Sequence, residues 1–355
     1  MSDIADLSKG IGISKDQLSA DGEPCILYGE LYTKYKSETI KEVISKTNID
    51  NTKLVKSKAN DVIIPCSGET AEEIATARCV LKDDILLGGD LNIIRLHGYD
   101  GSFMSYQLNG KRKYDIAKVA QGVSVVHLYG EHLKNIKTIN PSLNEQKKIA
   151  NLLSLLDERI STQNKIIEKL ETLIKGIEQH WIKNITSRSI YVKLGDICQI
   201  TTGKLDANAQ VDNGIYPFFT CAEQPFKIDS FAFDTEALLI SGNGANLGYI
   251  NYYNGKFNAY QRTYVLDVFS ENIQYIKWVL KVLLPKRIAI EKSSSNTPYI
   301  LLSTLSDLML PIPSKENQYH IAELMQSLER KLSSQITLNG SYNILKQYLL
   351  RQMFI

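Results

Sequence analysis

The sequence predicts an α+β fold, in which two mixed α/β domains are separated by two long helices that pair as an antiparallel coiled coil. Three observations lead to this fold. One long segment carries apolar residues at coiled-coil spacing, the start of that segment recurs later in the chain, and short strand-like runs precede each copy. Together they indicate an internal duplication with approximate two-fold symmetry.

The first long helix is expected over residues 143–185, where the inward positions recur in alternating steps of four and three. These positions are Ile149, Leu153, Leu156, Ile160, Gln163, Ile167, Leu170, Ile174, Ile177 and Trp181. Such a sustained repeat is typical of a helix that lies along another helix. At about 1.5 Å per residue the helix is roughly 60 Å long, so its apolar stripe needs a partner of similar length.

The partner helix is predicted from a repeat at a constant offset of 172 residues. Pro141-Ser142 and Gln146 recur as Pro313-Ser314 and Gln318. An internal repeat of this kind decides the architecture of the whole chain. We therefore expect a first domain over residues 1–142, a first helical rod over 143–185, a second domain over 186–311 and a second rod over 312–355.

The first domain alternates short apolar runs with turns rich in Gly, Pro and Ser, which is typical of short strands. Strands are expected at residues 25–32, 61–65 and 83–87 and a helix at 71–77, with further apolar runs at 92–96, 103–108 and 125–128. Lys111-Arg112-Lys113 is the most basic cluster of this domain.

The second domain opens at residues 192–197 and shows the same alternation. Extended runs are expected at 216–220, 237–240, 249–253, 257–261 and 264–268, a tight polar turn at 201–204, a helix at 272–285 and a polar loop at 292–298. Leu86-Leu87-Gly88-Gly89-Asp90 in the first domain resembles Leu239-Ile240-Ser241-Gly242-Asn243 in the second. One scaffold with two different surfaces suits a protein that reads two different things.

Two-fold symmetry predicts that the rods run antiparallel and meet at their midpoints. Gln163 and Gln335 occupy the same repeat position in an otherwise apolar seam, so we expect them to face each other and to fix the register. A slip would leave such polar groups unpaired in an apolar layer. The expected register pairs Ile149 with Leu349, Leu153 with Leu345, Ile160 with Leu338, Leu170 with Leu328 and Ile177 with Ile321.

The composition is that of an ordinary globular protein, with 43% hydrophobic and 23% charged residues among 355 and a formal net charge of +2. A non-specific nucleic-acid binder is usually more basic, so DNA binding would rely on local patches or on a partner subunit. The five cysteines form no Cys-x-x-Cys pair, which predicts neither a disulfide framework nor a zinc site. Without a membrane-length apolar run or a signal peptide, a cytoplasmic protein that does not bind membranes is expected.

Catalytic motifs are missing from the sequence. There is no Gly-x-x-x-x-Gly-Lys phosphate loop, and the run at 242–248 is one residue too long for a dinucleotide-binding fingerprint. The Asn/Asp-Pro-Pro-aromatic motif of amino-group methyltransferases is absent, and the five histidines are scattered. We therefore expect a non-catalytic protein with no cofactor and no metal ion.

The duplicated order of domain and rod resembles the specificity subunit of type I restriction–modification enzymes. The resemblance lies in the Pro-Ser-x-x-Glu/Asn-Gln-x-x-Ile-Ala start of each rod and in six shorter runs. These are Pro24-Cys25-Ile26-Leu27-Tyr28-Gly29-Glu30-Leu31-Tyr32-Thr33, Leu87-Gly88-Gly89-Asp90, Leu194-Gly195-Asp196-Ile197, Thr202-Gly203-Lys204-Leu205 with Tyr216-Pro217-Phe218-Phe219, and Gln261-Arg262-Thr263-Tyr264-Val265. The family implies two target-recognition domains that each read half of a split, asymmetric site on double-stranded DNA. It also implies rods that set the gap and dock two adenine-methyltransferase subunits, which nuclease/translocase subunits then join.

Recognition domains vary widely within this family, so the candidate DNA contacts come from residue types. Glycine-rich polar loops let the backbone approach DNA, Asn and Gln pair bidentately with adenine, and Lys and Arg contact phosphates. The candidates are Tyr28, Lys34, Lys36, Ser67, Gly89, Lys111, Arg112, Lys113 and Gln121 in the first domain, and Thr202, Lys204, Asn243, Asn246, Gln261, Arg262, Ser294 and Asn296 in the second. Taken one at a time, each could instead be an ordinary turn or a solvated surface residue.

A second interpretation of the sequence is a non-catalytic coiled-coil scaffold that joins two protein- or ligand-binding domains. The near-neutral charge slightly favours this interpretation. The duplicated order and the shared motifs favour DNA recognition.

Overall fold

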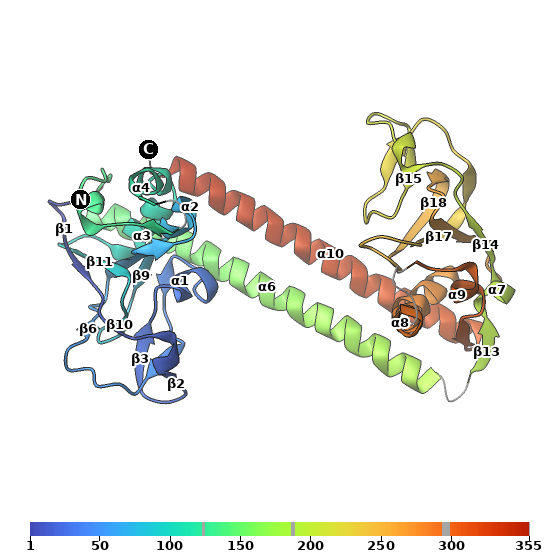
Figure 1. Cartoon of the computed structure of the whole chain (residues 1–355), viewed down its shortest axis with the longest axis horizontal. Coiled ribbons are helices and arrows are strands. Elements are labelled where there is room, and N and C mark those ends of the chain that lie inside the picture. Colours follow the sequence, from blue (N-terminus) through green and yellow to red (C-terminus); the bar gives the residue numbers. More distant parts are fainter. Residues whose placement is uncertain (123–124, 186–188, 293–298, 355) are drawn as a thin grey trace. The chain divides into compact units, whose positions relative to one another are not determined.

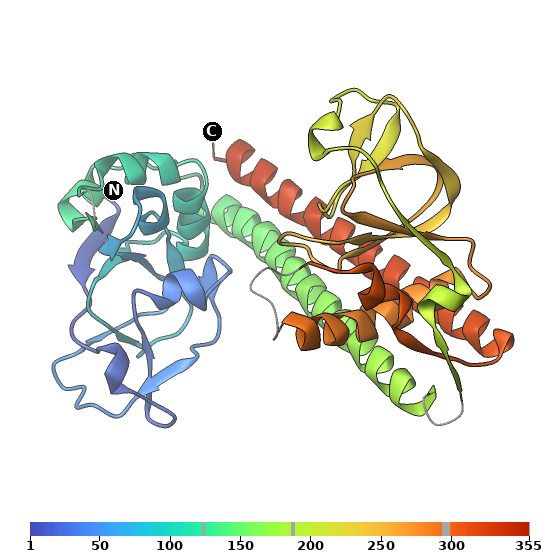
Figure 2. The same ribbon diagram turned by 45° about the vertical axis from the view of Figure 1, so that its right-hand side comes forward.

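The computed structural model describes residues 1–122, 125–185, 189–292 and 299–354. The chain divides into two compact units. Unit 1 comprises Met1–Lys165 and Ile336–Ile355, and unit 2 comprises Ile166–Gln335. Each unit therefore contains one α/β domain and one half of each long helix (Figure 1 and Figure 2).

The two long helices are α6 (Leu143–Ile185) and α10 (Lys315–Gln352). All ten predicted seam positions of α6 are buried or half-buried, whereas Leu152 and Leu155 beside the seam are exposed. The ten positions that lie 172 residues later, nine of them in α10 and the tenth at Met353 just after it, are also buried or half-buried. The 4–3 repeat therefore identifies the inward face of both helices, as expected for a coiled-coil seam.

The helix halves in unit 1 run antiparallel, but in a different register from the expected one. Asn339 Nδ2 donates to Asn164 Oδ1 at 2.8 Å, although the expected register would place Asn164 opposite Ser334. Two expected seam residues, Leu338 and Leu345, are 39% and 45% exposed. The expected register is about one helical turn out, because facing residues must both lie on the inward seams.

Gln163 belongs to unit 1 and Gln335 to unit 2, so their expected pairing stays a prediction. Gln163 is 6% exposed, so a buried amide does lie on this seam. In unit 2 the same antiparallel order holds, since Trp181 lines one small cavity together with Ile321, and Ile177 lies near Leu324.

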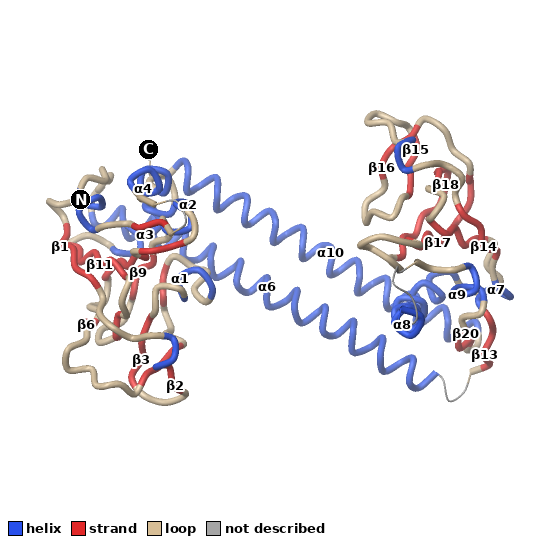
Figure 3. Tube along the Cα trace, viewed as in Figure 1, coloured by secondary structure: helices blue, strands red, loops and turns tan. Residues whose placement is uncertain are grey.

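Unit 1 contains two five-stranded sheets with short helices around them (Figure 3). Its strands are β1 (Ala5–Lys9), β2 (Leu18–Ser19), β3 (Glu23–Ile26), β4 (Thr39–Ile40), β5 (Ser45–Thr47), β6 (Val55–Lys56), β7 (Asp61–Pro65), β8 (Ser67–Gly68), β9 (Arg78–Val80), β10 (Leu86–Leu87), β11 (Leu91–Leu96) and β12 (Val126–His127). Its shorter helices are the 3-10 turn η1 (Lys15–Gln17), α1 (Glu30–Thr33), α2 (Ala71–Ile74), α3 (Gly101–Asn109), α4 (Lys113–Val119) and α5 (Gly130–Lys134). The sheet orders are β1-β11-β7-β9-β4 and β2-β5-β3-β10-β6, and β12 pairs with β8.

Two expectations for unit 1 need correction. The expected strand at 25–32 ends at Ile26 and is followed by α1, because the Glu30 carboxylate accepts a hydrogen bond from the Leu27 N–H at 3.0 Å and closes a turn. The expected strand at 83–87 forms only at Leu86–Leu87. The apolar run at 103–108 belongs to α3, whose N-cap is Asp100.

Unit 2 contains a six-stranded sheet of order β14-β19-β17-β18-β15-β16 and a separate pair, β13 with β20. The strands are β13 (Ile190–Lys193), β14 (Gln199–Thr202), β15 (Tyr216–Phe219), β16 (Phe226–Ile228), β17 (Phe233–Ser241), β18 (Ile250–Ala259), β19 (Thr263–Asp267) and β20 (Met309–Ile312). The helices are α7 (Leu194–Ile197), the 3-10 turn η2 (Ala207–Ala209), α8 (Ile273–Lys292) and α9 (Leu302–Ser306).

Unit 2 also differs from expectation in three places. The two strands expected at 249–253 and 257–261 form one long strand, β18, in which Gly255 adopts a φ of +129° that favours glycine. The turn expected at 201–204 begins later, because Thr201 and Thr202 belong to β14. The helix expected at 272–285 continues through Pro285 to Lys292.

The duplication is visible in individual hydrogen bonds at the start of each long helix. Gln146 Oε1 accepts from the Asp100 N–H at 2.9 Å, and Gln318 Oε1 accepts from the Asn272 N–H at 3.1 Å. Both glutamines are 1% exposed. Asp100 and Asn272 are 172 residues apart, and their side chains accept from the N–H groups three residues on, at the starts of α3 and α8. The repeated Gln thus docks each long helix onto the N-cap of a domain helix.

Candidate nucleic-acid interface

Unit 1 has a groove of about 930 Å³ beside α1. It is lined by Gly12, Ile13, Ser14, Lys15, Gln17, Leu18, Leu27, Tyr28, Gly29, Glu30, Thr33, Lys34, Gly89 and Asp90. The groove contains three predicted contact residues, Tyr28, Lys34 and Gly89. Two lysines, a tyrosine ring and several hydroxyl and amide groups give it the chemistry that phosphate and base-edge contacts require.

Two loops form one wall of this groove. The Gly89 N–H donates to the Gly12 carbonyl at 2.7 Å, and the Gly10 N–H donates to the Leu91 carbonyl at 2.9 Å. Gly10 lies so close to Gly88 that a Cβ there would come within 2.0 Å of the Gly88 oxygen. The exposed Lys15 follows these loops and lines the groove, and it was not among the predicted contact residues. The spacing of Gly10 and Gly12 before Ser14 and Lys15 was the available signal.

Lys34 is held in place by its own neighbours. Its ammonium lies 2.7 Å from Glu30 Oε1 and 2.7 Å from Ser45 Oγ, and its side chain is 39% exposed. Glu30 is buried, so Lys34 compensates a carboxylate while it lines the groove. Lys36 lies just beyond α1 and outside the groove lining, with its Nζ 3.5 Å from the Tyr32 carbonyl.

Ser67 and Gln121 lie together on a second patch of unit 1. Ser67 pairs with His127 across β8 and β12, and Gln121 exchanges two backbone hydrogen bonds with the same His127. The patch continues to the groove through Cys66, whose N–H donates to the carbonyl of the groove residue Asp90 at 2.7 Å. Burial raises the pKa of the Cys66 thiol to about 11, so this cysteine is structural at neutral pH.

The basic cluster Lys111-Arg112-Lys113 lies elsewhere in unit 1. Arg112 forms an ion pair with Asp115 at 3.3 Å, and the preceding Gly110 packs against the carbonyl of Leu350 near the end of α10. These residues do not line the groove, and their phosphate contacts stay a prediction.

In unit 2 the predicted loops converge around Cys221. The Cys221 thiol lies 3.0 Å from Asn243 Oδ1, and the Cys221 carbonyl accepts from Asn246 Nδ2 at 3.1 Å. The Gly242 N–H donates to the Arg262 carbonyl at 2.8 Å, and the Gln261 N–H donates to the Leu205 carbonyl at 2.9 Å. Lys204 and Thr202 precede Leu205, so five predicted loop residues and the end of β14 form one polar surface.

Gln261, Arg262, Lys204 and Thr202 are exposed on this surface, while Asn243 and Asn246 are half-buried. Exposed Arg and Gln side chains beside held asparagine amides suit contacts to phosphates and to base edges. Cys221 was not predicted, although its place at the centre orders both asparagines. Ser294 and Asn296 lie outside the residues that the structure describes.

Across residues 1–122, 125–185, 189–292 and 299–354, no three His, Cys, Asp or Glu side chains are grouped so that they could hold a metal ion. Within those ranges, no helix is both long and apolar enough to cross a membrane.

Comparisons with known proteins agree on one family. The family model described as "Type I restriction modification DNA specificity domain" matches residues 1–172 and again 189–339. The EcoDI specificity subunit of Escherichia coli is 43% identical over 143 residues, which cover 40% of this chain and 32% of that protein. The MjaVIII specificity subunit of Methanocaldococcus jannaschii is 24% identical over an alignment that covers 92% of this chain and 85% of that protein.

The fold also matches a solved structure. The S subunit of a type I restriction–modification system from Mycoplasma genitalium superimposes with a TM-score of 0.74 at 20% sequence identity. The alignment covers 100% of this chain and 94% of the other. At this level of identity the match concerns the fold.

Proposed function

Because the chain belongs to the type I restriction–modification DNA specificity family, we propose that its two units each read one half of a split DNA site. The chain is the DNA-recognition component of such a system. The reading surfaces in this proposal are the unit 1 groove with Lys15, Tyr28 and Lys34, and the unit 2 loops around Cys221.

One observation carries the proposal: the two units share a docking device but not a reading surface. Gln146 and Gln318 make matching hydrogen bonds, which supports a common scaffold. The groove beside α1 and the loops around Cys221 contain different residues on different elements. Different surfaces on a repeated scaffold would read an asymmetric site, with half-sites roughly 10 bp apart from centre to centre.

Methyltransferase subunits are the proposed partners of the long helices. In unit 1, Leu152 and Leu155 of α6 are 48% and 52% exposed, and Ile344 and Tyr348 of α10 are 73% and 60% exposed. Neighbouring exposed apolar side chains of this size mark surfaces for protein partners. In this proposal the helices dock two adenine methyltransferase subunits, nuclease/translocase subunits join them, and the chain itself performs no catalysis.

The test is to express the chain with the methyltransferase gene of the same operon and to map methylated adenines across the genome. A single split, asymmetric motif is expected, and replacing residues 186–311 by another recognition domain should change only one half of it. If both halves change together, or if no methylation depends on the chain, the proposal is wrong. Methyl transfer by the purified chain alone would refute its non-catalytic role.

The docking surface is tested separately. The double variant Leu152→Glu, Leu155→Glu should prevent co-purification of the methyltransferase while binding of DNA by the chain persists. The matched control is Glu158→Gln, on the same helix but on an exposed charged position. Co-purification that survives both variants would remove this surface from the proposal.

A further inference from the structure

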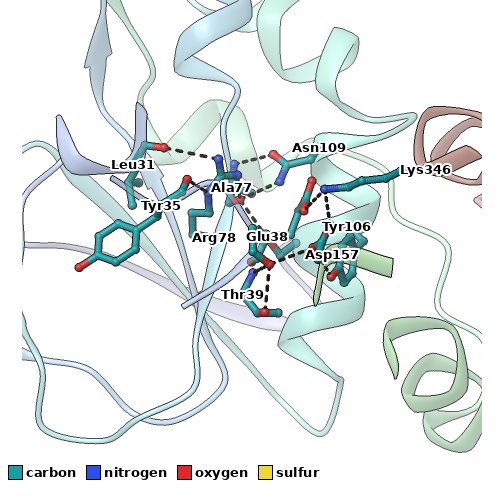
Figure 4. A network of polar contacts seen from close by, with 12 residues as sticks. Leu31, Tyr35, Glu38, Thr39, Ala77, Arg78, Tyr106, Asn109, Asp157 and Lys346 are labelled. Carbon is teal, nitrogen blue, oxygen red and sulfur yellow. Dashed lines mark hydrogen bonds and ion pairs between the residues drawn. The ribbon is translucent and has the colours of Figure 1, made fainter. Parts of the chain in front are cut away.

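A buried polar network in unit 1 connects both long helices with the segment that carries the groove (Figure 4). Its centre is Lys346 of α10, whose Nζ lies 2.6 Å from Glu38 Oε2 and 2.7 Å from Asp157 Oδ1 of α6. The three side chains are only 12%, 8% and 8% exposed. Lys346 occupies a seam position of α10 at which the other copy of the repeat has Ile174. Burying a lysine on an apolar seam costs free energy unless its charge is paired with a carboxylate.

Asp157 extends the network to two further residues of the domain. Its Oδ2 accepts from the hydroxyl of Tyr106 on α3 at 2.7 Å and from the hydroxyl of Ser37 at 2.9 Å. Ser37 and Glu38 are adjacent, so both side chains at this point of the chain are anchored to the long helices. Burial alone would raise the pKa of Asp157, but Lys346 and these hydroxyl donors outweigh it and hold the pKa below its ordinary value.

Arg78 anchors the same segment from its other end. Its Nε donates to the Tyr35 carbonyl at 3.1 Å, and its Nη2 lies 3.4 Å from the Leu31 carbonyl, so the guanidinium binds backbone at the end of α1. Figure 4 shows these bonds beside Glu38, which acts on Arg78 electrostatically. Residues 31–38 are thus held at one end by Arg78 and at the other by Lys346 and Asp157.

This segment contains two residues of the groove, Thr33 and Lys34. The charged groups of the network are the carboxylates of Glu38 and Asp157 and the cations of Arg78 and Lys346. Arg78 belongs to strand β9 of the domain, whereas Lys346 belongs to the long helix α10. Without Lys346, Glu38 and Asp157 would repel each other across a buried site. Glu38 lies in a loop and Asp157 lies in a long helix, so the segment would move and the helix would not.

We propose that Lys346 is a positioning residue for DNA reading: through Glu38 and Asp157 it fixes residues 31–38, and so sets how strictly unit 1 discriminates its half-site. The proposal rests on the proposed function of the groove. It makes a residue near the end of the second long helix a determinant of specificity in the first domain.

The functional test compares Lys346→Met with Lys346→Arg in the full chain, expressed with its methyltransferase. Methylation rates are measured on the mapped site and on sites with single base changes in either half. Lys346→Met should lower discrimination in the half read by unit 1 about tenfold, the size of one well-placed base contact, and leave the other half unchanged. Lys346→Arg should retain discrimination. Equal loss in both halves, or no loss in either, would overturn the proposal.

Two further measurements keep the proposal separate from general stability and from the proposed function. Arg78→Lys acts at the opposite end of residues 31–38 and should weaken discrimination in the same half-site. Lys277→Met, the matched control in unit 2, should leave that half-site unaffected. Hydrogen exchange of the purified chain should speed up about tenfold in peptides covering residues 31–38 for Lys346→Met and stay unchanged for Lys346→Arg. Unchanged exchange refutes the positioning role, whereas missing methylation by the wild type refutes only the proposed function.

Discussion

The ion pairs that fix the two domains to the long helices are arranged in opposite ways. In unit 1 a single lysine, Lys346, lies between two carboxylates. In unit 2 one carboxylate, Glu329, forms ion pairs with two lysines, Lys277 at 2.9 Å and Lys281 at 2.7 Å. The half-buried Glu178 of α6 lies near this cluster and interacts electrostatically with Lys281. Both clusters occupy the same place in the duplicated scaffold, so their difference shows what duplication preserved and what it allowed to change.

The preserved parts are the carboxylate of the long helix and an aromatic ring of the domain helix. Asp157 and Glu329 are 172 residues apart, as are Tyr106 and Trp278. The cations differ between the two units: in unit 1 the cation is Lys346 on the long helix α10, whereas in unit 2 the cations are Lys277 and Lys281 on the domain helix α8. The lysines of unit 2 also lie over the Trp278 ring, with Lys281 Nζ 4.1 Å from its centroid. The ion pairs of unit 1 therefore join both long helices to the domain, whereas those of unit 2 join α10 to α8.

The largest expected difference follows from removing one lysine from each cluster. Lys346→Met leaves two buried carboxylates without their cation and should destabilise unit 1 by about 3–5 kcal/mol. Lys277→Met keeps the ion pair between Lys281 and the half-exposed Glu329, so it should lower the free energy of unfolding of unit 2 by about 1 kcal/mol or less. Scanning calorimetry measures both transitions, and tryptophan emission assigns the one from unit 2, because Trp181 and Trp278 both lie there. Equal losses would show that burial does not distinguish the clusters.

The pH dependence of the two clusters should have opposite signs in alkali. Burial would lower the pKa of Lys346, but Glu38 and Asp157 raise it above 10.5. Burial lowers the pKa of Lys277 despite Glu329. A lysine whose pKa is raised on folding stabilises the folded state, and this stabilisation is lost as the pH rises through the folded pKa. A lysine whose pKa is lowered on folding destabilises the folded state, and this destabilisation disappears as the pH rises towards 10.5.

Calorimetry at several values between about pH 9 and 11, with the Lys→Met variants as references, measures these contributions. The contribution of Lys346 should fall over the upper part of this range and that of Lys277 should rise over the lower part. Contributions of the same sign would mean that the reversed arrangement has no electrostatic effect.

A smaller and symmetric effect is expected at the repeated glutamines. Gln146→Ala and Gln318→Ala each leave a backbone N–H at a helix N-cap without its buried acceptor, which costs about 1–3 kcal/mol. The two variants should lower the stability of their own units by similar amounts in urea unfolding. A strong asymmetry here would show that the scaffold, and not only its charge, has diverged.

The smallest effect is expected from an exposed ion pair that also joins the first domain to α6. Lys41 pairs with Glu158, and the two side chains are 48% and 56% exposed. Lys41→Ala should change the thermal midpoint of unit 1 by no more than the equivalent of about 0.5 kcal/mol. A loss comparable to that of Lys346→Met would mean that burial does not decide the strength of these contacts.

Much of the fold follows from the sequence because repeats and periodicity report on packing directly. The 4–3 repeat identified the buried face of α6, and the offset of 172 identified α10 as its partner. The expected register of the two helices was wrong because it paired apolar residues without requiring that both lie on the inward 4–3 seams. Leu338 and Leu345 are apolar but exposed, whereas the polar Lys346 lies on the seam and is compensated by carboxylates distant in sequence. No local sequence pattern predicts an ion pair between residues so far apart in the chain.

The candidate interface shows the same limit at the level of single residues. Glycine and asparagine loops identified the surface around Cys221, because tight turns have strong local signals. Lys15 and the contacts of residues 31–38 were missed, since the latter come from Arg78, Asp157 and Lys346, which are distant in sequence. The short helix α1 was predicted as a strand because its start depends on one hydrogen bond, which the Glu30 carboxylate accepts from the Leu27 N–H.

The core beneath Phe103 has a consequence for how the protein is made. Phe354 is 1% exposed and its ring centroid lies 5.2 Å from that of Phe103, and Leu350 completes the same cluster. The ribosome synthesises Phe103 early and Phe354 only after all of unit 2. At about 5–20 residues per second, the first domain waits roughly 13–50 s with this apolar face uncovered. The domain that emerges first is therefore the last to finish folding, and that interval is when a holding chaperone would matter most.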